Sequence, residues 1–252
     1  MIYVYAITEG APPPQALVGL PGFDDTPVAA REVDGIAAAF GRVAAAPRPS
    51  TEAVWQHERV VERLMADRPL LPARFGTLMR DVAAVDGVLA ANHERLATGL
   101  ERVRGCVELG VRALWRADEW DDDSASTPPP EEGAVPADDD GAGRAYLMAL
   151  ADRERRRRRT EVRAAELAAN LNRMFLPLAR DGVVRQLPTA QFVIAGAYLV
   201  PTERVEGFRA AVNDAGAALG RLRLVCSGPW PPYHFVPALS LPPAPTAEVS
   251  RG

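Results

Sequence analysis

Histidine and cysteine are two residue types that often bind metals or act in catalysis, and both are scarce in this sequence. The chain has three histidines, His57, His93 and His234, and no second ligand stands three or four positions after His57 or His93. Cys106 and Cys226 form no CxxC pair, and each lies in an apolar run, which favours buried free thiols. We therefore predict no metal site and no cofactor. We expect His57 and His93 to be solvated, because both lie in charged helical stretches.

Two runs of charge could suggest binding of an ion or a polyanion. Residues 138–141 (DDDG) lack the glycine and glutamate spacing of an EF-hand loop, which indicates a solvated acidic run. Arg155 to Arg159 wrap more than one helical turn, so their side chains point in every direction rather than toward one ligand. With a net charge of −4 for the chain, we predict no nucleic-acid binding. We expect the longer acidic segment from Asp118 to Asp140 to pair with these arginines and screen them.

Two short segments carry side chains that could recognise a partner. In "LPARFGTL" (71–78), Arg74 stands beside Phe75 in an apolar stretch, and the pattern favours a strand edge with Arg74 paired to a carboxylate over a binding arginine. In "GPWPPYHF" (228–235), the prolines exclude a central strand and favour a stiff extended arm. That arm presents three aromatic side chains that pack or dock, namely Trp230, Tyr233 and Phe235. We expect Trp230 to be buried in the C-terminal domain.

The sequence contains none of the motifs that mark common enzyme sites. There is no GxSxG, P-loop, HExxH or strand-following GxGxxG. An enzyme would have to use Arg74 and His234 on one substrate atom, and no nucleophile–base pair is visible. We predict no catalytic residues.

The elements that must position these residues are mixed in type. The first half shows a strand at 2–7, a hairpin turning at Asp34-Gly35, a helix capped by Ser50 or Thr51, and one long helix from Asp81 to about Arg104. Val54, Val61, Leu64 and Met65 are expected on the buried face of the first helix. The segment 106–115 is predicted to be a strand.

The composition changes sharply after this strand. Ten acidic residues and three consecutive prolines lie between Asp118 and Ala142, with almost no large apolar side chain after Trp120. A long helical pattern then opens the second half, followed by strand, strand, helix and strand. We therefore predict an α+β protein with a domain at 1–117, a flexible acidic connector at 118–142 and a second α+β domain at 143–252.

Four segments together resemble the gas vesicle protein F/L family over nearly the whole chain. They are "YVYAI" (3–7), "LPARFGTL" (71–78), "GRAYL" (143–147) and "SGPWPPYHFV" (227–236). The family pattern often has Glu where this chain has Ala145, and its connector looks shorter. The resemblance implies two α+β domains, the C-terminal one ferredoxin-like.

The resemblance also implies a non-enzymatic accessory or minor structural protein of gas vesicle assembly. Its partners would be the hydrophobic shell protein and other accessory proteins. A small-molecule regulatory module of ferredoxin-like type is the alternative. Because the N-terminus lacks signal-peptide features and no apolar run could span a bilayer, we expect a cytoplasmic protein associated with gas vesicles, with no membrane partner.

Overall fold

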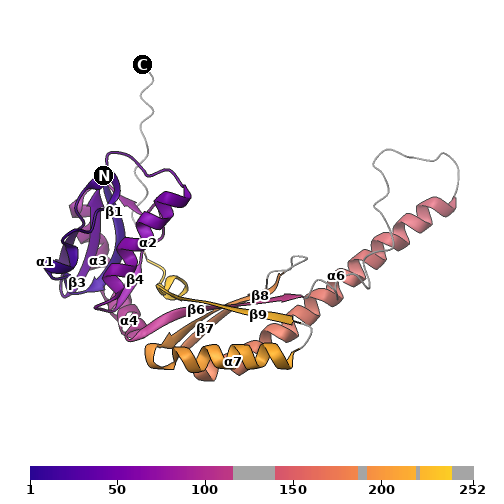
Figure 1. The fold of residues 1–252 in the computed structure, drawn as a ribbon. Coiled ribbons are helices and arrows are strands. Elements are labelled where there is room, and N and C mark those ends of the chain that lie inside the picture. The colour runs from indigo at the N-terminus through magenta and orange to yellow at the C-terminus, as the bar shows by residue number, and fades with distance from the viewer. Residues whose placement is uncertain (116–139, 187–191, 220–221, 240–252) are drawn as a thin grey trace, which may run out of the picture. The chain divides into compact units, whose positions relative to one another are not determined.

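The fold was described in a computed structural model, which places residues 1–115, 140–186, 192–219 and 222–239. The chain divides into two compact units (Figure 1). The first unit joins Met1–Glu108 to the segment that starts at Pro229, and the second unit is Leu109–Gly228. The first unit is therefore built from two separate stretches of sequence.

This division differs from the predicted boundaries in two respects. The first unit ends at Glu108 rather than at residue 117, and the segment after Pro229 belongs to it rather than to the second unit. The physical reason is that Tyr233, His234 and Phe235 contact residues of the first unit. The predicted connector lies outside the described residues, apart from 140–142, which begin a helix.

The first unit is a five-stranded sheet with helices. Its strand order is β2-β3-β1-β4, with β5 also paired to β1. β1 pairs antiparallel with β3, β4 and β5, and β2 pairs antiparallel with β3. The elements are β1 (Ile2–Glu9), α1 (Pro14–Leu17), η1 (Phe23–Asp25), β2 (Ala29–Val33), β3 (Ile36–Arg42), α2 (Thr51–Met65), β4 (Leu70–Pro72), β5 (Leu78–Met79), α3 (Val82–Ala91), α4 (His93–Val103) and η4 (Tyr233–Phe235).

The predicted strand and hairpin of this unit are confirmed. The turn between β2 and β3 places Asp34 at φ 49° and Gly35 at φ 80°, the pair of positive values that a tight primed hairpin turn requires. β1 is buried along nearly its whole length. On one of its faces Tyr3 and Tyr5 join Val60, Val61 and Leu64 of α2 in a core cluster.

The single long helix predicted from Asp81 to Arg104 is wrong. Two helices, α3 and α4, meet at Asn92, whose φ of −117° and ψ of 13° are not helical. The Asn92 side chain is buried and donates to the backbone oxygen of Val88 at 2.9 Å, so a side-chain bond supports the bend. The apolar stripe that predicted this helix is nevertheless buried, and it consists of Val85, Leu89, Leu96, Leu100 and Val103. Asp81 caps α3 by accepting from the Ala84 amide at 2.8 Å.

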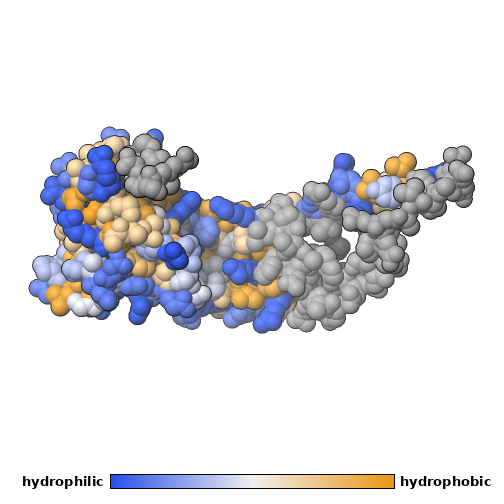
Figure 2. All heavy atoms as spheres, turned by 90° about the horizontal axis from the view of Figure 1, so that it is seen from above, coloured by the Kyte–Doolittle hydropathy of each residue, from blue (hydrophilic) through white to orange (hydrophobic). Residues whose placement is uncertain are grey.

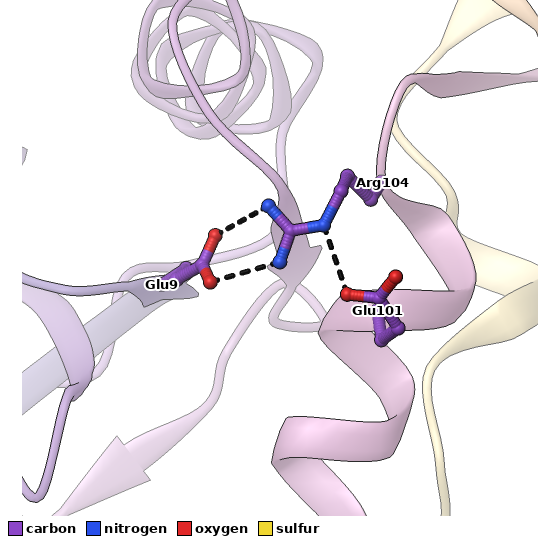
Figure 3. A network of polar contacts seen from close by, with 3 residues as sticks. All are labelled: Glu9, Glu101 and Arg104. Carbon is purple, nitrogen blue, oxygen red and sulfur yellow. Dashed lines mark hydrogen bonds and ion pairs between the residues drawn. The ribbon is translucent and has the colours of Figure 1, made fainter.

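The end of α4 is fixed by an ion-pair network. Arg104 donates from both terminal nitrogens to Glu9 at 2.7 and 2.8 Å and from Nε to Glu101 at 2.9 Å (Figure 3). This bidentate geometry joins the end of β1 to the end of α4. Gly105, at φ 65°, then turns the chain into the next strand.

The second unit is a four-stranded sheet in the order β7-β8-β6-β9. Along the chain its strands and main helices follow one another as β-α-β-β-α-β, the order of the split βαβ motif to which ferredoxin-like domains belong. β6 begins, and β9 ends, within the first unit. The elements are β6 (Cys106–Trp115), α6 (Asp140–Phe175), η2 (Leu176–Leu178), β7 (Asp181–Gln186), β8 (Phe192–Pro201), η3 (Thr202–Arg204), α7 (Val205–Ala218) and β9 (Leu222–Trp230).

One face of this second sheet packs against the two helices. Phe175 of α6, Tyr198 of β8 and Phe208 of α7 meet with ring centroids 5.3 to 5.8 Å apart. Aliphatic residues of all four strands join them, including Val111, Val184, Ile194 and Leu222. The mixed α+β class predicted from the sequence is confirmed.

Candidate interaction surface of the first unit

The proline-rich segment Pro229–Val236, called here the return segment, is the part of the first unit that lies far from the rest in sequence. Gly228 precedes it at φ 107°, a conformation that side chains other than glycine rarely adopt. Pro231 and Pro232 are buried, and their carbonyl oxygens accept from the amides of Tyr233 and Phe235 at 2.8 and 3.1 Å. Pro229 and Trp230 thus end β9, and the residues after them form a short internally bonded turn rather than the extended arm predicted from the sequence.

Three consecutive residues anchor the return segment. The Tyr233 hydroxyl donates to Glu58 of α2 at 2.7 Å. His234 bonds to Glu108 twice, from its backbone amide at 2.9 Å and through ring Nδ1 at 2.7 Å. The Phe235 ring is 1% exposed, and the Arg102 guanidinium lies 5.4 Å from its centroid.

The polar anchors are partly withdrawn from water. Burial raises the pKa of the Glu58 carboxyl, the hydrogen bond from Tyr233 acts in the opposite direction, and the nearby Glu62 carboxylate adds to the rise. Burial and the Glu58 carboxylate together raise the pKa of the Tyr233 hydroxyl far above its usual range, so Tyr233 remains the donor. Because Glu108 is 5% exposed, its two bonds to His234 satisfy a carboxyl group that would otherwise be costly to bury.

Other side chains near these anchors face outward. Trp230 is 40% exposed, and the expectation that it would be buried in the C-terminal domain is wrong. On α2, Val54 and Trp55 stand four and three residues before Glu58, so they share its flank of the helix, and they are 41% and 57% exposed. We call Val54, Trp55, Trp230 and Tyr233 the aromatic surface. It combines fixed backbone with exposed apolar side chains.

The segment around Arg74 is a tight loop whose backbone is hydrogen-bonded to two buried side chains, His57 and Tyr3. The Ala73 carbonyl oxygen accepts from Nε2 of His57 at 3.1 Å, and the Gly76 amide donates to the Tyr3 hydroxyl at 3.0 Å. The Tyr3 hydroxyl lies 3.0 Å from Nδ1 of His57, and it donates there because Nε2 carries the ring proton. Both ends of the loop are therefore bonded to the same buried pair.

His57 is not the surface residue that the sequence indicated. It is 1% exposed, and burial lowers its pKa to about 4. Burial likewise raises the pKa of Tyr3 to about 12, so the pair is neutral over a wide pH range. A signal was available, since His57 is spaced three, four and seven residues before buried positions of α2, whereas the predicted core residue Val54 is 41% exposed.

The buried pair leaves Arg74 exposed and Phe75 half-buried. Phe75 packs its ring against Tyr3, Phe23 and His57 at 6.0 to 6.2 Å. Within the described residues, the Arg74 side chain has no carboxylate partner, so the predicted ion pair is absent. Arg74 is instead presented to solvent by a loop whose backbone is fixed.

The chemistry of the described residues is limited. They contain no cluster of three His, Cys, Asp or Glu side chains that could hold a metal ion. The His234–Glu108 pair resembles the base and the carboxylate of a catalytic triad. In the part of the chain described here, however, no hydroxyl or thiol nucleophile is bonded to the other ring nitrogen. Both cysteines are free thiols, Cys106 buried and Cys226 half-buried. No helix of the described residues is long and apolar enough to cross a bilayer.

Comparison with known proteins assigns a family to this arrangement of two α+β units. The family described as gas vesicle synthesis protein GvpL/GvpF matches residues 1–237, so the chain belongs to that family. Gas vesicle protein F of Streptomyces sp. (strain CB03234) is 30% identical over 93% of this chain and 98% of its own length. Gas vesicle protein L of the same strain is 28% identical over 92% and 91%.

A solved structure shares the fold. The crystal structure of GvpF from Anabaena sp. PCC7120 matches with a TM-score of 0.70 and 21% identity, covering 94% of this chain and 96% of that one. The family resemblance read from the sequence is therefore confirmed. F-type and L-type relatives match to a similar extent.

Proposed function

We propose that this chain is a non-enzymatic accessory or minor structural protein of gas vesicle assembly. In this proposal it binds the hydrophobic shell protein and other accessory proteins, in the cytoplasm and at the vesicle. Membership of the gas vesicle GvpL/GvpF family supports a role in gas vesicle assembly. Family membership also supports partners among the gas vesicle proteins, and the exposed apolar surface of the first unit supports an apolar partner.

The observation that carries the proposal is the aromatic surface. Tryptophan and tyrosine held on a fixed backbone lose little conformational entropy on binding, which is why they recur at the energetic centres of interfaces. Trp230 and Trp55 are 40% and 57% exposed, while the backbone beneath them is fixed by the Tyr233–Glu58 and His234–Glu108 bonds. Such a surface suits an apolar partner better than a small polar substrate.

A pairwise binding screen tests the proposal. The full chain would be tested against the shell protein and each accessory protein of its gas vesicle gene cluster. We expect at least one of them to bind, and the Trp230→Ala variant to lose roughly tenfold or more in affinity for that partner. Val18→Ala is the control, because Val18 is 77% exposed at the C-cap of α1, away from the aromatic surface in the sequence.

Two results would contradict the proposal. One is the absence of binding to every component by a folded chain. The other is an equal loss of affinity in Trp230→Ala and Val18→Ala, which would remove the aromatic surface from the interaction. Deleting the gene is expected to abolish vesicles, and restoring it with the Trp230→Ala form should recover them only in part.

A further inference from the structure

Helix α6 extends beyond the core that it packs against. Its buried residues run from Ala164 to Phe175 and belong to the core of the second unit. None of the described residues from Arg144 to Arg159 belongs to that core, and in Figure 1 this part of α6 continues past the strands and α7 of its own unit. At the usual helical rise, the stretch from Arg144 to Ala164 is about 30 Å long. We call residues 144–159 the projecting helix.

The projecting helix exposes a group of large apolar side chains near its start. Tyr146 is 59% exposed, Leu147 63%, Met148 56% and Leu150 49%. Hydrophobic residues are visible at the surface of this part of α6 at the right of Figure 2, beside hydrophilic ones. Single exposed apolar side chains are ordinary on folded proteins, whereas a contiguous group marks an interaction site. This group is therefore a candidate docking surface.

The two ends of the projecting helix differ in what stabilises them. In the later part, Asp152 pairs with Arg155 and Glu154 pairs with Arg158, at the i,i+3 and i,i+4 spacings that support a helix in water. Among the described side chains from Arg144 to Leu150, no such ion pair occurs. A short helix without tertiary packing is only marginally stable. The apolar part of the projecting helix therefore gains most from a partner.

One face of the projecting helix carries an ordered set of side chains. Arg144, Leu147, Ala151 and Glu154 follow one another at spacings of three, four and three residues, which place them along one side of a helix, and all four are exposed. Glu154 accepts from Nε of Arg158 through one oxygen, at 3.0 Å, and Arg144 has no ion pair with another described residue. The order along this face is thus cation, apolar, apolar, carboxylate.

This order is complementary to its own reverse. When two copies of the face lie antiparallel with residue 149 opposite residue 149, Arg144 of one copy lies opposite Glu154 of the other, and Leu147 lies opposite Ala151. A two-fold axis makes each of these contacts twice. A parallel pair would instead place Arg144 beside Arg144, where like charges repel.

We propose that the projecting helix binds the projecting helix of a second copy of this chain, in an antiparallel pair. Tyr146, Leu147 and Leu150 form its apolar centre, because Leu150 stands one helical turn from both of the others. Arg144 of each copy donates to Glu154 of the other. The contact is a few helical turns long and one helix wide, which is at the small end of specific interfaces, so the two copies associate reversibly.

The observations favour a second copy over two other occupants. An anionic lipid surface attracts helices whose exposed arginines are not neutralised, yet Asp152 and Glu154 lie among the arginines of the projecting helix. These two carboxylates pair with Arg155 and Arg158. An unrelated partner protein gives no reason for Arg144 and Glu154 to stand at equal distances on either side of residue 149.

Sedimentation velocity of the full chain at low salt tests for the pair. We expect a monomer at low micromolar concentration and a growing fraction of dimer as the concentration rises toward millimolar. Leu147→Glu should weaken the dimer roughly tenfold or more, because it places a charge in the apolar centre. Trp230→Ala should leave the dimer unchanged, since Trp230 belongs to the first unit. Circular dichroism confirms that each variant is folded.

Exchange of charges tests the antiparallel order. Arg144→Glu and Glu154→Arg should each weaken the dimer roughly fivefold, because each places like charges opposite one another at both contacts. An equimolar mixture of these two variants should dimerise again, since every contact between the unlike chains joins opposite charges. Glu166→Arg is the matched control, because Glu166 is an exposed glutamate in the part of α6 that packs on the sheet, and it should change the dimer less than about twofold.

Each step of the proposal has a result that would overturn it. A chain that stays monomeric at the highest concentration excludes the pair. A dimer that survives Leu147→Glu, or that Trp230→Ala abolishes, forms elsewhere on the chain. A mixture of the two charge variants that stays monomeric excludes the antiparallel order. Co-sedimentation of a monomeric chain with anionic phospholipid vesicles, lost in Leu147→Glu, would make the projecting helix a membrane contact. None of these results depends on whether the aromatic surface binds the shell protein.

Discussion

The two units bury aromatic rings of similar size in different ways. In the first unit, the hydroxyls of Tyr3 and Tyr5 bond to the Gly76 and Phe23 amides, and His57 bonds both to Tyr3 and to the Ala73 carbonyl. In the second, Phe175, Tyr198 and Phe208 make ring contacts, and the Tyr198 hydroxyl has no hydrogen bond to another described residue. Polar side chains of the first core therefore bond to the backbone of loops, whereas rings of the second core pack helices against a sheet.

This difference shows what each core positions. A polar network with every member bonded specifies one arrangement of the backbone that it contacts. The network of the first unit therefore fixes the loop that presents Arg74, and the bonds of Glu58 and Glu108 fix the segment that presents Trp230. The core of the second unit holds α6 only from Ala164 onward and leaves the earlier part of that helix, with Tyr146 and Leu147, exposed.

The largest effect is expected from the apolar core of the second unit. Phe175→Ala should lower the free energy of unfolding of that unit by about 3–5 kcal/mol, because it removes a fully buried ring and leaves a cavity. Hydrogen exchange measured by mass spectrometry should speed up in β7 and β8 and not in β1. Met174→Ala is the control, since Met174 is 47% exposed, and an equal effect there would contradict the packing described.

Acidification should lower the stability of the first unit, whose core contains His57, more than that of the second unit. Burial lowers the pKa of His57 to about 4 in the folded chain, against about 6.5 when unfolded, so the unfolded chain binds more protons between these values. The contribution of neutral, buried His57 to the free energy of unfolding is complete above pH 6.5. It falls by roughly 3 kcal/mol as the pH drops toward 4. Carboxyls with a lowered pKa, such as Glu9 and Asp81, lose their contribution only below their ordinary range.

Urea unfolding at pH 7, 6 and 5, followed by NMR signals of β1 and β8, measures this effect. The β1 signals should show the loss of stability, and the His57→Gln variant should show a flatter dependence on pH. An unchanged pH dependence in His57→Gln would mean that another group titrates.

A matched pair of tyrosine variants tests the hydrogen bonds alone. Tyr3→Phe leaves the Gly76 amide and Nδ1 of His57 without their partner and should cost about 1–3 kcal/mol of unfolding free energy. Tyr198→Phe removes a hydroxyl that bonds to no described residue and should cost less than about 0.5 kcal/mol. Equal losses in the two urea titrations would remove the distinction between the cores.

The smallest effect is expected from the exposed network at the end of α4. Arg104 and Glu9 are each close to half exposed, so salt screens their attraction. Arg104→Ala should lower the midpoint of thermal unfolding slightly at low salt and not at about 1 M salt, where charges are screened within about 3 Å. A loss of the same size at both salt concentrations would point to packing by the arginine stem instead.

Local elements of this fold could be predicted from the sequence, and long-range pairings could not. The hairpin at Asp34-Gly35 and the caps at Ser50 and Asp81 follow from residue types next to one another. The break at Asn92 was missed because the apolar stripe continues across it, and only the side-chain bond to Val88 shows the bend. The burial of His57 was missed because the charged residues beside it outweighed its helical spacing to Val60, Val61 and Leu64, which are buried.

The two-segment construction of the first unit lay beyond sequence reasoning. Tyr233 bonds Glu58 across 175 positions, and His234 bonds Glu108 across 126. Neither carboxylate differs in its local sequence from a solvated one, so nothing in the residues nearby indicates which aromatic segment will return to them. Of the segments singled out, "LPARFGTL" and "SGPWPPYHFV" both lie in the first unit, apart from Ser227 and Gly228.

The return segment also sets an order of events during synthesis. Pro229–Val236 is translated after every residue of the second unit, and domains generally fold as they leave the ribosome. The second unit can therefore finish folding while Glu58 and Glu108 still lack their partners. The aromatic surface is completed last, so a chain that stops before residue 229 cannot present it.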